Sequence, residues 1–243
     1  MRLPRMIVSA VLFSLAVAGA AGPAARPNVL FIAIDDQNDW IGAFGGHPLA
    51  KTPHMDRLAG RGSAFLNAHC QAPWCNPSRT SLLMGVRPTT TGIYGLAPWF
   101  RTLPRWQNHV TLPQHFRASG YRTLTAGKIY HGGVGGPKKQ AEEFDVWGPA
   151  GGIGVKPEKK LVGPTPMGNN PLMDWGVFPH RDEDKGDYQV APWAAEQIRT
   201  AGKDQPYFPA AGVFPPPLAP HAPPHGVDPF PGADPGAPPG AGG

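Results

Sequence analysis

Strongly basic segments are scarce in this 243-residue sequence. The formal net charge is +5, and the only adjacent basic residues are Lys138-Lys139 and Lys159-Lys160. A surface that binds nucleic acid gathers its Lys and Arg residues into a patch or a stripe. The scattered charges therefore indicate solvated surface, and the sequence predicts no nucleic-acid partner.

Cysteine is almost absent, since Cys70 and Cys75 are the only two. A disulfide between them would close a very small loop that contains Pro73. Cys75 could equally be an inert buried thiol or a reactive one. The sequence by itself leaves these alternatives open.

Long hydrophobic runs are missing except at the N-terminus. There, Arg2 and Arg5 precede the apolar run "MIVSAVLFSLAVAGA", which ends in small residues. This pattern predicts a signal peptide over residues 1–22 and export to the periplasm or the extracellular space. A retained membrane anchor is the alternative, but the run is short for a membrane span, so we expect no stable membrane insertion after cleavage.

Proline and glycine, by contrast, are abundant, with 32 of each. About half of the last forty residues are Pro or Gly, a composition that excludes regular helix or sheet. We therefore predict an irregular tail over residues 215–243 and a folded region over residues 26–214. Hydrophobic residues make up 41% of the chain, enough for a buried core.

The folded region alternates between strand and helix patterns. Strands are predicted over 28–34, 63–70, 121–128 and 206–214, and helices over 52–60, 76–85, 111–120 and 187–202. Pro192 lies awkwardly inside the last helix and Pro209 inside the last strand. Such alternation predicts an α/β fold with a mainly parallel sheet flanked by helices.

Several polar side chains that can carry chemistry follow or begin these elements. In an open α/β sheet, ligand sites lie at the carboxyl ends of the strands. Two adjacent carboxylates suit a hard divalent cation, and a helix N-terminus with an arginine suits an anion. We therefore predict a site for a tetrahedral oxyanion beside a metal, formed by Asp35, Asp36, Cys75, Arg79, Lys128 and His131.

The segment "CNPSR" (75–79) matches the C-x-P-S-R signature of the sulfatase family, which this chain resembles. The flanking segments "RPNVLFIAIDD", "TSLLMGVRPTTTGIY" and "LPQHFRASGYRTLTAGKIYH" are similar to the family as well. The segment "MDWGVFPHRDEDKGDYQVAPWAAEQI" looks like the bacterial branch related to iduronate-2-sulfatase. The resemblance covers residues 26–214 and implies the alkaline-phosphatase-like fold.

The resemblance also implies a chemistry for Cys75. In sulfatases the signature cysteine is oxidised to formylglycine, whose hydrated form is a geminal diol. One hydroxyl attacks sulfur, and the other lets the bound sulfate leave, which is nucleophilic catalysis with its own release step. By the same resemblance, Asp35, Asp36 and the modified Cys75 would bind Ca²⁺ or Mg²⁺.

The remaining roles follow from the same comparison. Arg79 would stabilise formylglycine and the anion, Lys128 would contact the sulfate, and His131 would hydrogen-bond the nucleophile. The implied partners are a formylglycine-generating enzyme and a sulfated small molecule or glycan as substrate.

The chain departs from the family pattern near its end. Pro215 and Pro217 stand where the family has an Arg and a His, and His221 is out of register. Family members are also considerably longer and take further metal ligands from the part beyond this one. We therefore expect an N-terminal portion that is incomplete at the C-terminus and inactive as written. The alternatives are a phosphate or phosphonate ester hydrolase of the same superfamily and an inactive anion-binding relative.

Overall fold

The computed structural model describes residues 26–48, 50–132, 140–163, 174, 176–202, 204–214 and, for the backbone only, 221–222. The predicted signal peptide and most of the predicted tail lie outside these residues. The main sheet consists of β1 (Phe31–Ile34), β5 (Tyr207–Val213), β2 (Arg122–Gly127) and β3 (Val146–Trp147). These strands lie in the order β1-β5-β2-β3 and all pair in parallel, so the prediction of a mainly parallel sheet is confirmed.

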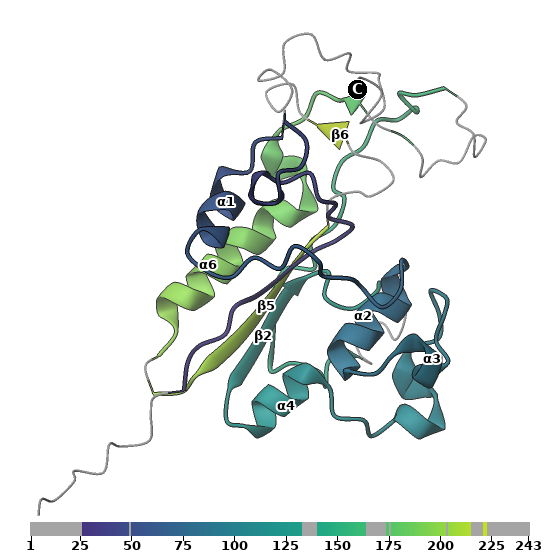
Figure 1. Ribbon diagram of the computed structural model, residues 1–243, viewed down its shortest axis with the longest axis vertical. Coiled ribbons are helices and arrows are strands. Elements are labelled where there is room, and N and C mark those ends of the chain that lie inside the picture. Colours follow the sequence, from purple (N-terminus) through teal and green to yellow (C-terminus); the bar gives the residue numbers. More distant parts are fainter. Residues whose placement is uncertain are drawn as a thin grey trace, which may run out of the picture.

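Helices lie on both sides of the strands (Figure 1). The helices α1 (Pro53–Ala59) and α6 (Val190–Thr200) are on one side, and α2 (Cys75–Met84), α3 (Pro88–Thr91) and α4 (Leu112–Ala118) are on the other. Short 3₁₀ helices join them: η1 (Gly42–Phe44), η2 (Phe100–Thr102), η3 (Pro104–Trp106), η4 (Asp182–Asp184) and η5 (Gly186–Gln189). A separate parallel pair joins β4 (Gly176–Val177) to β6 (His221–Ala222). No helix in the described part of the chain is both long and apolar enough to cross a bilayer.

Two core clusters hold the helices against the sheet. The larger lies on the side of α2 and α4, where the rings of Phe116 and Phe208 stack with centroids 4.3 Å apart. The smaller lies under α6 and consists of Ala126, Val190, Ala194 and Ala211. Because this second cluster is built from small side chains, α6 can approach the strands closely.

The predicted helices are confirmed, and the structure explains the awkward proline in the last one. Helix α2 ends before Gly85, whose φ of 67° is the left-handed conformation typical of a helix C-terminus. Helix α6 begins at Val190, so Pro192 is its third residue. The first four N–H groups of a helix have no acceptor within it, and a proline there costs no hydrogen bond.

Pro209 lies inside the central strand β5 and affects the neighbouring strand β1. In the observed register, an N–H at position 209 would face the carbonyl of Val29. Proline has no such donor, and β1 begins only at Phe31 rather than at the predicted Asn28. The ladder continues on the other side of β5, where Lys128 N–H donates to the carbonyl of Gly212 at 3.0 Å.

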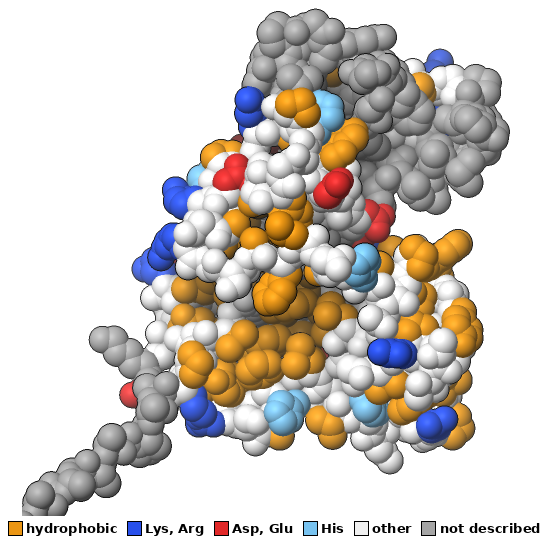
Figure 2. All heavy atoms as spheres, viewed as in Figure 1, with side chains coloured by type: hydrophobic (Ala, Val, Ile, Leu, Met, Phe, Trp, Pro, Cys, Tyr) orange, Lys and Arg blue, Asp and Glu red, His pale blue; other side chains and the backbone are white. Residues whose placement is uncertain are grey.

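The strand predicted over residues 63–70 is wrong, since this segment forms no regular structure. Phe65 and Leu66 are each 75% exposed, so the apolar residues that suggested a strand are not packed on the sheet. Leu30, just before the edge strand β1, and Ile32, within that strand, are about half exposed as well. Figure 2 shows a broad hydrophobic surface over the strands in the middle of the molecule.

Two glycines bring the carboxyl ends of β2 and β5 close together. Gly127 has a φ of 70°, and a Cβ at this position would collide with the carbonyl oxygen of Gly212. A Cβ at Gly212 would in turn collide with the backbone of Lys128. The close approach of these strand ends therefore requires glycine, and it places Lys128 at the edge where β1 also ends.

Candidate active site

The candidate site is centred on Asp35, the first residue after β1. Its carboxyl is only 5% exposed, and its two oxygens accept from different cations. Arg79 Nη2 forms an ion pair with Oδ1, and Lys128 Nζ forms one with Oδ2. The structure thus brings together three of the predicted site residues from β1, α2 and the end of β2.

Arg79 also fixes the backbone that follows β2. It lies one turn into α2 and is buried, and its Nη1 donates to the carbonyls of Lys128 at 2.7 Å and of Ile129 at 2.9 Å. The planar guanidinium can serve these acceptors and Asp35 at once because its donors form a rigid fork. Arg79 therefore holds the strand end, the following turn and the carboxylate in one arrangement.

Opposite charges shift the pKa of Asp35. Burial by itself would raise the pKa of the carboxyl. The hydrogen bonds and positive charges of Lys128 and Arg79 outweigh burial and hold this pKa below its ordinary value of 3.8. Asp35 is therefore ionised at neutral pH and neutralises much of the cationic charge around it.

Cys75 is the first residue of α2 and lies beside Lys128. Its half-buried Sγ is 3.7 Å from Lys128 Nζ, so the residue predicted to become the nucleophile lies next to the predicted anion-binding ammonium. The preceding residue, Trp74, has extended backbone, so the helix begins at Cys75. The N–H groups of the first turn of α2, which have no acceptor within the helix, therefore lie near Cys75. These groups and the helix dipole favour negative charge at this end of the helix.

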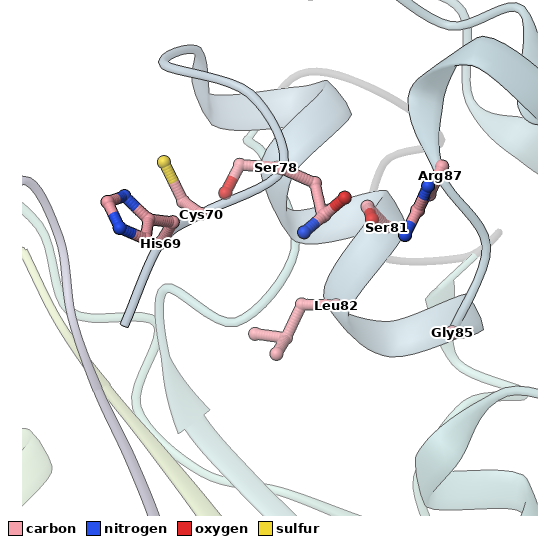
Figure 3. Close-up of a pocket in the computed structure, with 8 residues that line it drawn as sticks. His69, Cys70, Ser78, Ser81, Leu82, Gly85 and Arg87 are labelled. Atoms are coloured by element: carbon pink, nitrogen blue, oxygen red, sulfur yellow. The ribbon is translucent and has the colours of Figure 1, made fainter. Parts of the chain in front are cut away.

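The cysteines are not paired in the structure, where both are free thiols. Cys70 is exposed and lines a hollow of about 470 Å³ between its own segment and α2, together with His69, Ser78, Ser81 and Leu82 (Figure 3). This hollow is distinct from the site around Asp35. Of the alternatives that the sequence left open for Cys75, the disulfide is not observed, and an inert or a reactive free thiol remains.

His131 lies at the margin of the site and is about half buried. Its ring Nδ1 is buried and has no hydrogen-bond partner within the described residues. Burial, followed by the positive charges of Lys128 and Arg79, lowers the pKa of the ring, and Asp35 raises it by a smaller amount. No hydrogen bond between this ring and Cys75 is present in the described structure, so the predicted contact with the nucleophile stays a prediction.

We expect Lys128→Met to raise the pKa of His131, because the substitution removes a neighbouring positive charge that disfavours the protonated ring. Burial, the largest cause of the lowered pKa, would remain, so the pKa should rise only part of the way to 6.5. An NMR titration of the ring protons measures this, with the exposed His69 as an internal control. An unchanged or lower pKa would contradict the described electrostatics.

The described residues do not by themselves form a metal site. Asp36 is exposed, with a φ of 48°, an uncommon conformation that aspartate tolerates. Both oxygens of Asp35 are already engaged by cations. Among the described residues, no group of three or more His, Cys, Asp or Glu side chains could hold an ion. The donors present therefore do not fit a complete cation cage, which for Ca²⁺ needs about six to eight oxygens.

Phe214 is a neighbour of the site that no pattern in the sequence singles out. Its ring lies against Lys128 Nζ, 3.8 Å from the ring centroid. Phe214 was expected only as the last apolar residue of a strand, and no spacing in the sequence relates it to Lys128. Only the parallel alignment of β2 and β5 could have indicated this contact.

A parallel sheet with an arginine, a lysine and a helix N-terminus converging at its carboxyl edge is an arrangement typical of α/β proteins that bind oxyanions. The chain matches the Sulfatase family model over residues 27–238 and therefore belongs to the sulfatase family, whose members are hydrolases acting on sulfate esters. Its fold is accordingly part of the alkaline-phosphatase-like architecture.

Individual relatives agree with this assignment. The chain is 37% identical over 211 residues to a sulfatase of Formosa agariphila, covering 82% of this chain and 40% of that protein. It is 39% identical over 107 residues to human iduronate 2-sulfatase, covering 44% of this chain and 19% of that protein. The solved structure of a 2-O GAG sulfatase shares the fold, with a TM-score of 0.54 at 23% identity, over 77% of this chain and 35% of that one. The chain thus spans less than half the length of these relatives.

Proposed function

We propose that this chain carries the nucleophile and anion-binding part of a sulfatase that hydrolyses an organic sulfate ester. The observation that supports this most directly is the placement of Cys75 at a helix N-terminus, 3.7 Å from the ammonium of Lys128. A nucleophile and a cation at this separation can address the sulfur and an oxygen of one sulfate group.

In this proposal, each residue of the site has a separate task. Conversion of Cys75 to formylglycine would supply a hydrated aldehyde as the nucleophile. Lys128 binds a sulfate oxygen and offsets the charge that develops there, while Arg79 holds the lysine backbone and Asp35 in place. His131, whose lowered pKa keeps it neutral near pH 7, can accept or donate a proton at the margin of the site.

We further propose Ca²⁺ or Mg²⁺ as the metal, with Asp35, Asp36 and the modified Cys75 among its ligands. Both ions prefer carboxylate oxygens, and Asp35 could bind a cation by releasing one of its two ammonium or guanidinium partners. The further ligands would come from outside the described residues.

The proposed substrate is a sulfated glycan or a related small sulfate ester, and the proposed location is the periplasm or the exterior of the cell. The names of two relatives, an iduronate 2-sulfatase and a 2-O GAG sulfatase, support a sugar sulfate. The basic and apolar N-terminal segment supports export. A formylglycine-generating enzyme would be required as a partner.

We expect Cys75 to be converted to formylglycine when the chain is co-expressed with a maturation enzyme. The tryptic peptide that ends at Arg79 also contains Cys70, so alkylation followed by mass spectrometry compares the two thiols in one molecule. Conversion leaves one alkylated cysteine instead of two, and Cys70→Ala should not prevent it. Two alkylated cysteines, under conditions that convert a control protein, would exclude formylglycine and with it the proposed mechanism.

We expect no multiple turnover from the 243-residue polypeptide alone, even after conversion of Cys75. An incomplete cation cage holds the nucleophile poorly, and misplacement by about 1 Å can cost about 10²-fold in rate. The assay compares an aryl sulfate, a sulfated sugar and an aryl phosphonate, in the presence of Ca²⁺, with a Cys75→Ala control. Turnover of a sulfate above that control would show that the donors within these 243 residues suffice, and selective turnover of the phosphonate would contradict the proposed substrate class.

A further inference from the structure

The ammonium of Lys128 is enclosed from three directions. It forms an ion pair with Asp35, lies 3.7 Å from Cys75 Sγ, and lies 3.8 Å from the centroid of the Phe214 ring. The Lys128 side chain is only 11% exposed. The first two neighbours belong to the candidate site, whereas the Phe214 ring has no role in the proposed reaction.

The position of Phe214 is determined by Asp187. Phe214 follows β5 directly, and its backbone N–H donates to Asp187 Oδ2. The other oxygen, Oδ1, accepts from the N–H of Gly152 at 3.0 Å. One carboxylate in η5 therefore ties the end of β5, and with it the Phe214 backbone, to the loop that follows β3.

The close packing around Asp187 indicates that this link is rigid. Gly151 has a φ of 68°, and a Cβ there would come within 2.6 Å of Asp187 Oδ1. A Cβ at Gly186 would come within 2.8 Å of the carbonyl oxygen of Gly152. The loop and η5 thus approach each other as closely as glycine allows, and only a small residue at these positions permits the hydrogen bond to Gly152.

An aromatic ring at this place can restrict the orientation of the lysine ammonium. The ammonium is a point charge on a flexible four-carbon stem, and hydrogen bonds alone leave several rotamers open. The negative face of an aromatic ring attracts the ammonium and excludes water from that side, with a typical strength of about 0.5–2 kcal/mol. The donors of Lys128 then remain directed toward Asp35 and the region beside Cys75.

We propose that Phe214, held in place by Asp187, is a positioning residue that orients the Lys128 ammonium toward a substrate oxyanion through a cation–π contact. The contact recorded for the ring in the described structure is the one with the Lys128 ammonium. The part of this proposal that concerns the anion rests on the proposed function, whereas the arrangement of Phe214, Asp187 and Lys128 does not.

The arrangement is tested first without any anion, by NMR of the 243-residue chain. The ring current of Phe214 should shift the ε-methylene protons of Lys128 upfield, and Phe214→Leu should abolish the shift while keeping an apolar side chain. Asp187→Ala should reduce the shift because the ring loses its backbone anchor. Asp184→Ala is the matched control: this neighbouring acid, the last residue of η4, pairs with Arg181, and its removal should leave the Lys128 shift unchanged. A wild-type chain without the shift, or an Asp187→Ala chain that keeps it fully, would overturn the arrangement.

The functional part is tested with inorganic sulfate as the probe. Phe214 is replaced by mono-, di- and trifluorophenylalanine, which weaken the negative ring face stepwise at nearly constant shape. We expect the affinity for sulfate to fall at each step, and Phe214→Leu to lower it about 2- to 30-fold, the range that corresponds to a cation–π contact. In a Lys128→Met background the same substitutions should have no effect. Equal affinities across the fluorinated series, or losses that persist without Lys128, would overturn the positioning role.

The two tests distinguish a failure of the proposed oxyanion site from a failure of the proposed role of Phe214. A wild-type chain that shows the ring-current shift but no sulfate binding would contradict the oxyanion site of the proposed function, and with it the positioning role, while leaving the contact itself established. A chain that binds sulfate through Lys128 but is insensitive to fluorination would contradict only the role of Phe214.

Discussion

Replacement of Glu143 by alanine is expected to lower the free energy of unfolding by about 3–5 kcal/mol, the typical cost of removing one partner of a buried ion pair. Glu143 is 0% exposed, and its carboxylate forms an ion pair with Arg101. It also accepts hydrogen bonds from Thr111 Oγ1 at 2.6 Å and from Tyr130 OH at 2.9 Å. The substitution would leave three donors in the interior without their common acceptor.

Tyr130 connects this buried network to the candidate site. It lies between Lys128 and His131 in the chain, and burial together with the charge of Glu143 raises its pKa well above 10. The phenol therefore stays protonated and donates to Glu143, which fixes the segment that carries both site residues. We expect the loss of Glu143 to loosen this segment as well as the core.

Denaturant unfolding monitored by circular dichroism measures the effect of Glu143→Ala. Glu142→Ala is the control, because the neighbouring glutamate is exposed and only its backbone carbonyl is bonded, to Arg117. This control should change stability by less than about 0.5 kcal/mol. Equal unfolding midpoints for the two variants would contradict the importance of the network.

The second large effect is expected at Arg79, where alanine should destabilise the protein by about 3 kcal/mol or more. The substitution leaves Asp35 with one cation instead of two and removes the donor for the carbonyls of Lys128 and Ile129. Arg79→Lys should recover only part of the loss, because a single ammonium cannot reach all three acceptors in the geometry of the guanidinium fork. Arg87→Ala, at an exposed arginine just beyond α2, is the control and should have little effect.

The contribution of Arg79 should also depend on pH. The pKa of Asp35 is lower in the folded protein than its ordinary value of 3.8, so the stabilisation is fully present above that value and is lost as the pH falls below it. The difference in unfolding free energy between wild type and Arg79→Ala should therefore shrink in acid. A difference that is constant from neutral pH down to well below 3.8 would show that the pair with Asp35 contributes nothing.

Local patterns correctly predicted helices whose start and end are each marked by a particular residue within the segment. Helix α2 was predicted because Pro77 suits its first turn and Gly85 suits its end, and both are properties of the backbone within the segment. The strand predicted over residues 63–70 failed because an apolar run specifies a strand only when another strand lies beside it. Phe65 and Leu66 are instead exposed, so burial and not composition decided this segment.

The sequence by itself determined the alternation of strands and helices, the position of Cys75 at a helix start and the acids after β1, because each depends on neighbouring residues. The tertiary structure alone decided which of these groups meet. Lys128 reaches Asp35 across 93 residues because β5, although the last of the four main-sheet strands in the sequence, lies between β1 and β2. Strand order reflects the packing of the whole sheet, to which no local pattern is sensitive. The same strand order places Phe214, which follows β5, beside Lys128, which follows β2.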